Sequence, residues 1–142
     1  MTLSNAACAA LHKACFTMPR PWSETEFAGL LSMSDVFVIC GAGPSLAMGR
    51  VVVGEAELLT LAVGPAAQGR GLGRAALQAY ETESIARHAE VSFLEVAANN
   101  AAAIHLYLSH GYSESGKRRG YYSASDGTKI DALVLSKPLL WA

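Results

Sequence analysis

The stretch Gln68-Gly69-Arg70-Gly71-Leu72-Gly73 combines residue types and spacing that suit the binding of an anion. It follows an apolar run, residues 58–63, and precedes a helix-like segment, residues 74–88. Glycines at alternate positions leave a backbone that can take positive φ and approach a ligand closely. The N–H groups of such a turn, together with the positive end of the following helix dipole, favour a negative ligand. The stretch predicts a phosphate or pyrophosphate site, and a strand-to-helix turn without a ligand is the alternative.

The spacing of the glycines narrows the choice of ligand. Arg74 stands where the dinucleotide-binding fingerprint needs its third glycine, and no Gly-Lys-Ser/Thr triplet closes the loop as in a P-loop. The remaining pattern is Gln/Arg-x-x-Gly-x-Gly/Ala, the pyrophosphate loop of the GNAT acetyltransferases, which this stretch resembles. That resemblance implies that residues 68–74 bind acetyl-CoA.

Glu95 is the carboxylate whose position is unusual. It lies in Phe93-Leu94-Glu95-Val96-Ala97, inside an apolar run at 91–97 that predicts a central strand. Burial of an unpaired carboxylate is costly and favours its protonated form. A carboxyl group tuned toward neutrality suits a general base for an ammonium substrate. The alternative is a carboxylate that reaches the sheet edge or pairs with an arginine, and the residues alone leave both open.

Tyr107 lies on the next predicted helix, residues 101–109. It follows Ile104 by three residues and so stands at the margin of the apolar stripe of that helix. A phenol there can pack its ring and still point its hydroxyl group into a cleft. Simple packing in the core or on the surface is the alternative role.

The cysteines and histidines give no sign of a metal site. Cys8, Cys15 and Cys40 are odd in number and lack the spacing of metal ligands, which favours free thiols in a reducing compartment. No histidine has an orienting partner that the sequence reveals. Three are expected to be solvated near helix ends, and the fourth is expected to point away from the apolar stripe of its helix: His12, His88 and His110, then His105.

Composition bounds the class of protein. The 142 residues are enough for one domain, 1–142, and 51% of them are apolar while 16% are charged. The net charge is −1 and the one dense basic run is at 117–119, which argues against nucleic acid as a direct partner. No apolar run approaches the ~18 residues of a membrane span, and residues 1–16 show no signal-peptide pattern. We therefore expect a cytoplasmic globular protein.

Periodicity and capping residues predict the elements that would position these side chains. Ser4 is expected to cap a first helix, and Ser23 with Glu26 forms a capping box for a second that ends near Met33. Asn99 or Asn100 is expected to cap the helix at 101–109. Strands are predicted at residues 36–42, 46–53, 55–63, 91–97, 112–115 and 130–136. The order α-α-β-β-β-α-β-α-β-β predicts a mixed α/β domain with one central sheet flanked by helices.

The chain as a whole resembles the RimI family of GNAT acetyltransferases. Besides the glycine loop and the segment from Leu94 to Ile104, several short motifs carry the resemblance. They are Pro21-Trp22-Ser23, Glu55-Ala56-Glu57-Leu58-Leu59, Leu106-Tyr107, Gly111-Tyr112, Arg119-Gly120-Tyr121-Tyr122 and Asp131-Ala132-Leu133. Members of that family use acetyl-CoA to acetylate the N-terminal amine of a ribosomal protein. The resemblance therefore implies the same fold, co-substrate and class of acceptor.

The resemblance also implies roles for individual residues. Glu95 matches the general base of the family, and Tyr107 matches the general acid that protonates the leaving thiolate. The strand residues Leu61, Ala62 and Val63 match those that bind pantetheine and the thioester through their backbone. Asn100 matches an asparagine beside the cofactor.

Departures from the family pattern leave other functions open. The family usually begins with a strand, for which residues 1–3 are too short, so we expect a sheet that lacks the first N-terminal strand and has a bare edge there. Ala97 and Gly69 replace residues that are commonly basic or bulkier. An acetyltransferase of a small amine, with Glu55 and Glu57 in its pocket, a non-catalytic acyl-CoA-binding module and an unliganded interaction domain remain as alternatives.

Overall fold

The computed structural model describes residues 4–15, 23–41, 43–123 and 126–139, without the side chains of 12–15 and 66. Its helices and strands follow the predicted order. The helices are α1 (Asn5–Cys15), α2 (Glu24–Leu31), α3 (Leu72–Ala86) and α4 (Ala101–Ser109), with a short 3₁₀ turn η1 (Pro65–Ala67). The strands are β1 (Val36–Cys40), β2 (Ser45–Val52), β3 (Glu55–Val63), β4 (Val91–Ala97), β5 (Ser113–Ser123) and β6 (Lys129–Pro138).

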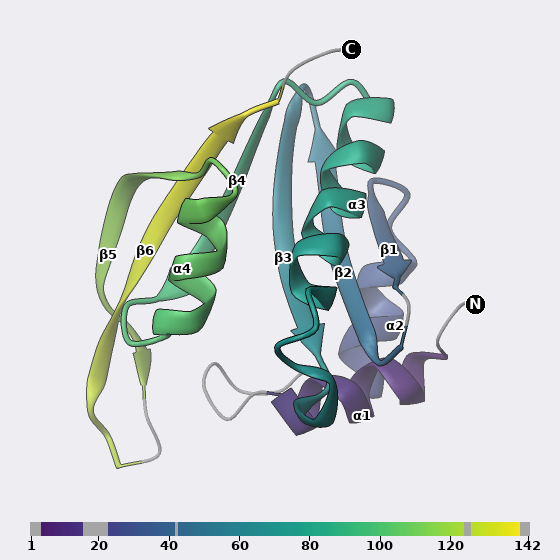
Figure 1. The fold of residues 1–142 in the computed structure, drawn as a ribbon. Helices are drawn as coiled ribbons and strands as arrows, with labels where there is room; N and C mark the ends of the chain where they lie inside the picture. Colours follow the sequence, from purple (N-terminus) through teal and green to yellow (C-terminus); the bar gives the residue numbers. More distant parts are fainter. Residues whose placement is uncertain (1–3, 16–22, 42, 124–125, 140–142) are drawn as a thin grey trace.

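The six strands form one mixed sheet in the order β1-β2-β3-β4-β6-β5. Every neighbouring pair is antiparallel except β3 and β4, which run parallel because α3 connects them. Helices cover both faces (Figure 1). One apolar cluster joins the sheet to α3 and α4 and includes Tyr80, Leu94 and Tyr107, whereas a second joins it to α1 and α2 and includes Cys8 and Phe27.

The parallel pair β3–β4 separates along its length. Its register runs only from Glu55 opposite Val91 to Leu58 opposite Leu94, although β3 continues to Val63 and β4 to Ala97. A bulge in β3 lies where the pairing with β4 ends. Gly49 of β2 pairs with Leu58 and Met48 pairs with Thr60, which leaves Leu59 as the extra residue. Figure 1 shows the two strands diverging toward the end where α3 begins. The sheet is therefore split at its centre.

The predicted mixed α/β architecture is confirmed, with differences at some boundaries. The bounds of β3, β4 and α4 are as predicted, and the capping box of α2 is present, with Ser23 and Glu26 joined by two bonds of 3.1 Å. Helix α2 ends at Leu31 rather than near Met33, and α3 spans Leu72–Ala86 rather than residues 74–88. Strands β5 and β6 are longer than predicted. Strand β5 continues through the basic run 117–119, and β6 pairs with it. Residues 1–3, on which the missing first strand was predicted, lie outside the described residues.

In the part of the chain that the structure describes, no helix is both long and apolar enough to cross a membrane. Among the same residues, no three His, Cys, Asp or Glu side chains gather in a way that could hold a metal ion.

Gly49 tests how tightly α3 packs on the sheet. A Cβ atom at this position would lie 2.7 Å from ring atoms of both Phe37 and Tyr80. We expect Gly49→Ala to lower the free energy of unfolding by about 1–3 kcal/mol, the usual cost of overpacking a core. Chemical denaturation followed by circular dichroism measures this change.

Gly29→Ala is the matched control. Gly29 lies inside α2, and a Cβ atom there would meet nothing within 4 Å. This change should leave stability equal or raise it by up to ~1 kcal/mol, since alanine favours the helix. Equal stability of the two variants would contradict the packing of α3 described above.

Candidate active site

A cleft of about 510 Å³ lies where β3 and β4 separate. Its walls come from the diverging ends of these strands, the glycine loop, and the first turns of α3 and α4. Most of the predicted site residues line it: Leu61, Ala62, Val63, Gln68, Gly69, Gly71, Leu72, Gly73, Glu95, Asn100 and Tyr107. The structure thus brings together residues that are far apart in the sequence.

The glycine loop forms the mouth of this cleft at the start of α3. Gly69 and Gly71 have φ of 80° and 76°, a left-handed conformation that favours glycine. An added Cβ would meet nothing within 4 Å at either position, so bare backbone faces open space. The first bond inside α3 runs from the N–H of Ala75 to the carbonyl of Gly71 (3.1 Å). The N–H groups of residues 72–74 therefore precede that bond and have no partner within the helix.

Two members of the predicted loop site do not line the cleft. Arg70 is exposed, and it is absent from the cleft wall. Arg74 directs its guanidinium to the end of α4, where Nη2 donates to Ser109 Oγ (2.6 Å) and Nη1 lies 3.3 Å from His110 Nδ1. The side chain of Arg74 therefore joins two helices, and only its backbone N–H belongs to the anion-binding turn.

Asn100 begins α4 beside the cleft. Its Oδ1 accepts a hydrogen bond from the N–H of Ala103 (3.2 Å), which identifies Asn100 rather than Asn99 as the helix cap. The side chain is thereby fixed at the wall that α4 presents to the cleft.

The structure decides between the two alternatives for Glu95. Its side chain is 25% exposed and forms an ion pair with Arg118, whose Nε lies 2.9 Å from Oε1. The expectation of a buried, unpaired carboxylate is therefore wrong, and the alternative of pairing with an arginine is the one observed. The strand alternation still holds, since Ser92, Leu94 and Val96 are buried while Glu95 is on the less buried face.

Tyr107 is a buried residue of α4 whose ring packs edge-on against Tyr112, with 5.9 Å between ring centroids. Burial, with a smaller contribution from nearby Tyr122, raises the pKa of the Tyr107 phenol well above its ordinary value. The phenol therefore keeps its proton through neutral and mildly alkaline pH. Among the described residues no side chain or backbone group hydrogen-bonds to its hydroxyl group, and Tyr107 is one of the residues that line the cleft.

A second cleft, of about 740 Å³, opens on the other side of Glu95. It shares Leu94 and Glu95 with the first cleft, so the carboxylate stands between the two. Its polar lining is Asp35, Arg50, Glu55, Glu57 and Arg118, and its apolar lining includes Val53 and Phe93. Arg50 pairs with Glu57 at 2.6 Å. This arrangement suits one cleft for an acyl donor and one for an amine acceptor.

Tyr122 is a site residue that the sequence did not single out for a role. It lines the first cleft, and burial, followed by the charge of Glu95, raises the pKa of its phenol to about 12. Its one sequence signal was the Gly120-Tyr121-Tyr122 motif, in a segment that was not predicted to be a strand. Since β5 continues to Ser123, the tyrosine is held beside the split.

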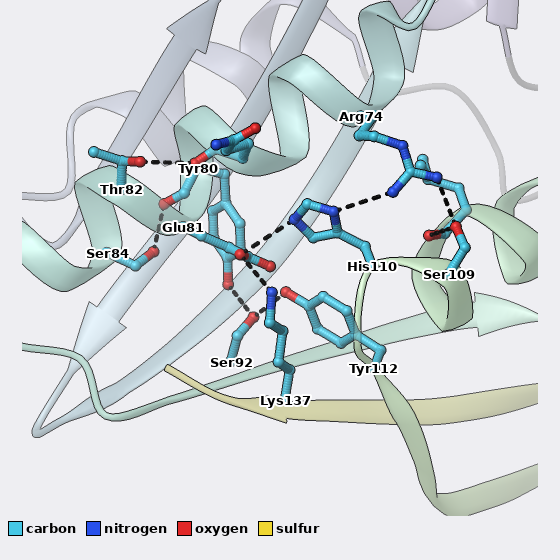
Figure 2. Close-up of polar contacts among 12 residues, drawn as sticks. Arg74, Tyr80, Glu81, Thr82, Ser84, Ser92, Ser109, His110, Tyr112 and Lys137 are labelled. Carbon is cyan, nitrogen blue, oxygen red and sulfur yellow. Dashed lines mark hydrogen bonds and ion pairs between the residues drawn. The ribbon is translucent and has the colours of Figure 1, made fainter. Parts of the chain in front are cut away.

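A polar cluster at the closed end of the split was also missed (Figure 2). Glu81 is buried, and its Oε1 lies 2.8 Å from Lys137 Nζ and 3.3 Å from His110 Nε2. His110 was expected to be solvated, which is wrong, because its side chain is only 15% exposed. A guanidinium can only donate, so the contact from Arg74 makes Nδ1 of His110 the acceptor and places the ring proton on Nε2, toward Glu81.

The sequence of this chain matches a known protein family. The model of the acetyltransferase (GNAT) family matches residues 8–112, from α1 through the glycine loop to the end of α4. This match covers more than half of the chain. The chain belongs to the acetyltransferase (GNAT) family.

Relatives within the family agree in sequence over most of their length. The [ribosomal protein bS18]-alanine N-acetyltransferase of Escherichia coli K12 is 40% identical over 122 residues, which cover 84% of this chain and 82% of that protein. The N-alpha-acetyltransferase RimI of Mycobacterium tuberculosis is 37% identical over 126 residues, covering 83% and 78%. This GNAT chain is thus an acetyl-CoA-dependent N-acetyltransferase.

Solved structures agree in fold. The ribosomal-protein-S18-alanine N-acetyltransferase of E. coli superposes with a TM-score of 0.85 at 35% identity, covering all of this chain and 92% of that one. The NAA60 protein of Arabidopsis thaliana in complex with acetyl-CoA superposes with a TM-score of 0.80 at 16% identity, which is a likeness of fold alone.

The residues of this GNAT chain fit acetyl-CoA on structural grounds. The loop offers a glycine backbone open to its surroundings, and the unpaired first N–H groups of α3 favour the diphosphate. The cleft continues from the loop between β3 and β4, so a long, narrow arm can follow it to Glu95 and Tyr107.

Gly71→Ala tests this binding site. A side chain at Gly71 would enter the space over which the loop N–H groups are presented. We expect the affinity for acetyl-CoA to fall at least tenfold, or about 1.4 kcal/mol. Isothermal titration calorimetry on the folded variant measures the affinity.

Gly127→Ala is the matched control, because Gly127 also has positive φ (88°) and open surroundings but lies in the β5–β6 connection. The two variants share the strain of a left-handed alanine, which thermal unfolding measures. If both bind acetyl-CoA equally, the glycine loop is only a turn.

Proposed function

We propose that this chain transfers the acetyl group of acetyl-CoA to the N-terminal α-amine of a protein, within one domain spanning residues 1–142. The observation that carries this proposal is the place of Glu95. It stands where the cleft with the glycine loop meets a second cleft, and the first of these clefts is also lined by a protonated phenol, Tyr107. When bound, acetyl-CoA supplies an activated acetyl thioester.

Glu95 acts as the general base. An α-amine has a pKa near ~7.7–8.0, so most of it carries a proton at neutral pH and cannot attack a carbonyl group. The carboxylate is partly open to the second cleft and can take that proton, directly or through one water molecule. A neutral amine with a free lone pair remains beside the first cleft.

Tyr107 acts as the general acid. Its burial preserves the proton at the pH of the reaction, and its position in the wall of the first cleft allows it to donate that proton to a leaving thiolate. Backbone groups of β3 beyond Leu58 are no longer part of the ladder with β4, so this edge can bind the arm of the donor.

The acceptor is a protein N-terminus, and the named relatives point to a ribosomal protein. The second cleft is long enough for more than an amine, since it extends from Glu95 to Val53 in the β2–β3 turn. A ribosomal acceptor places the enzyme in the cytoplasm, which agrees with the free thiol of Cys8. Neither nucleic acid nor a membrane is part of the proposed reaction.

Incubation with acetyl-CoA and a panel of synthetic peptides tests the function. The panel contains free N-termini that differ in the first residue, including alanine, and the same peptides with a blocked α-amine and an internal lysine. Mass spectrometry should find one acetyl group on the free α-amine and none on the blocked peptides. Turnover only of polyamines or aminoglycosides would favour the small-amine alternative, and binding of acetyl-CoA without any turnover would favour the non-catalytic module.

Glu95→Gln tests the base. The change preserves the shape of the side chain and removes the proton acceptor, so turnover of a peptide acceptor should fall by roughly 10²-fold or more. The affinity for acetyl-CoA should stay within a few-fold of wild type. Glu114→Gln, an exposed residue of β5, removes the same charge away from both clefts and should leave turnover unchanged. A Glu95→Gln enzyme with full activity would place the base elsewhere.

Tyr107→Phe tests the acid. It removes one hydroxyl group and keeps the packed ring, so turnover should fall by roughly 10²–10⁴-fold while folding and acetyl-CoA binding persist. Tyr112→Phe is the control on the neighbouring ring. The Tyr112 hydroxyl bonds to Ser92 at 2.8 Å inside the polar cluster, so its loss should cost about 1 kcal/mol of stability and little turnover. The opposite pattern would assign Tyr107 to packing.

A further inference from the structure

Arg118 contacts the Glu95 carboxylate at Oε1. Its Nε lies 2.9 Å from Oε1, and among the described residues Oε2 has no hydrogen-bond partner. The Glu95 side chain is 25% exposed and that of Arg118 is 57% exposed, so the pair sits at the border between protein and solvent. Both side chains line the second cleft.

Strand β5 holds Arg118 at this place through an irregular segment. The register with β6 shifts between Arg118 and Tyr122, and Gly120 takes φ of 59° within the shift. Its N–H donates to Asp131 Oδ1 at 2.8 Å, which fixes the irregular segment to β6. The guanidinium lies 5.4 Å from the ring centroid of Tyr121, a cation–π contact. The anchored backbone at Gly120 and the ring of Tyr121 together restrict the positions that the guanidinium of Arg118 can take.

The other charged groups around Glu95 do not replace this contact. Glu55 and Glu57 from β3 and Asp35 before β1 are carboxylates of the same cleft, and Arg50 from β2 is engaged with Glu57 at 2.6 Å. Tyr122 from β5 faces Glu95 as a neutral phenol at physiological pH, because its pKa is raised to about 12. Among the described residues, Arg118 is therefore the cation in contact with Glu95.

We propose that Arg118 is a positioning residue for Glu95 in the transfer reaction, an inference that rests on the proposed function. The guanidinium holds Oε1, orients the carboxylate and leaves Oε2 for the acceptor. In the proton step, an N–H bond of the acceptor ammonium breaks and an O–H bond forms at Oε2. The amine keeps the electron pair, Glu95 becomes neutral, and Arg118 keeps its charge.

Loss of this contact should act on the rate rather than on the binding of acetyl-CoA. Without the guanidinium the carboxylate can turn away from the acceptor, so kcat should fall. The effect is moderate, because both side chains are partly solvated and the solvent screens the pair.

The experiment compares Arg118→Gln with Arg119→Gln. Arg119 is the next residue; it carries the same charge, is also exposed and has no described contact. Arg119→Gln therefore changes the net charge by the same amount without removing a contact of Glu95. With a peptide acceptor, kcat should fall by roughly tenfold in Arg118→Gln, while the KM for acetyl-CoA stays within a few-fold of wild type. Arg119→Gln should keep the wild-type kcat. Arg118→Lys, which restores a cation, should recover most of the loss, and all three variants should bind acetyl-CoA normally.

Two further measurements separate this inference from the proposed function. Glu95→Gln, run in parallel, should lose roughly 10²-fold or more in kcat. If it does and kcat of Arg118→Gln stays at the wild-type value, the inference about Arg118 is wrong while the base role stands. The ¹³C NMR signal of the Glu95 carboxyl carbon needs no acceptor, and at neutral pH it should change in Arg118→Gln and not in Arg119→Gln. An unchanged signal in Arg118→Gln overturns the inference even if no peptide is acetylated.

Discussion

The parallel pairing of β3 and β4 ends after Leu58 and Leu94, and the candidate site depends on that interruption. A continuous ladder would fill the centre of the sheet with backbone hydrogen bonds and leave no cleft. The bulge at Leu59 and the antiparallel pairing of β4 with β6 along its whole length direct the two strands apart. Each strand thus remains paired on its outer side while its inner edge becomes a wall of the cleft.

Buried polar groups strengthen the connection between the two halves of the sheet at the end where β3 and β4 are still paired. Ser92 of β4 lies 2.8 Å from the hydroxyl groups of both Tyr80 on α3 and Tyr112 after α4. Glu81 of α3 contacts Lys137 of β6 and His110 after α4 (Figure 2). These contacts join α3, which packs on β2 and β3, to the half of the sheet that holds β4 and β6. A buried carboxylate is costly unless it is paired. The contacts of Glu81 therefore favour the packing of α3 in which Lys137 and His110 lie against it.

The sequence predicted those parts that local patterns determine. Apolar runs bounded by turn residues located β3 and β4, the glycine spacing located the loop, and a cap at Asn99 or Asn100 followed by an apolar stripe located α4. Strand β5 was underestimated because an edge strand tolerates charge and glycine, so Lys117, Arg118 and Gly120 resemble a loop. The partner of Glu95 was left open for a related reason, since Arg118 comes from that edge strand and no periodicity connects it with β4. Long-range pairs of this kind, like Glu81 with Lys137, exist only once the chain is folded.

The two proposed proton-transfer groups differ because the split exposes them to different surroundings. Tyr107 projects from α4 into an apolar cluster, and burial raises the pKa of its phenol, so the proton stays on oxygen. Glu95 is on the less buried face of β4, reaches the second cleft and lies against a guanidinium. The proposed roles follow these surroundings. The phenol that keeps its proton is the proposed acid, and the carboxylate that is open to the second cleft is the proposed base.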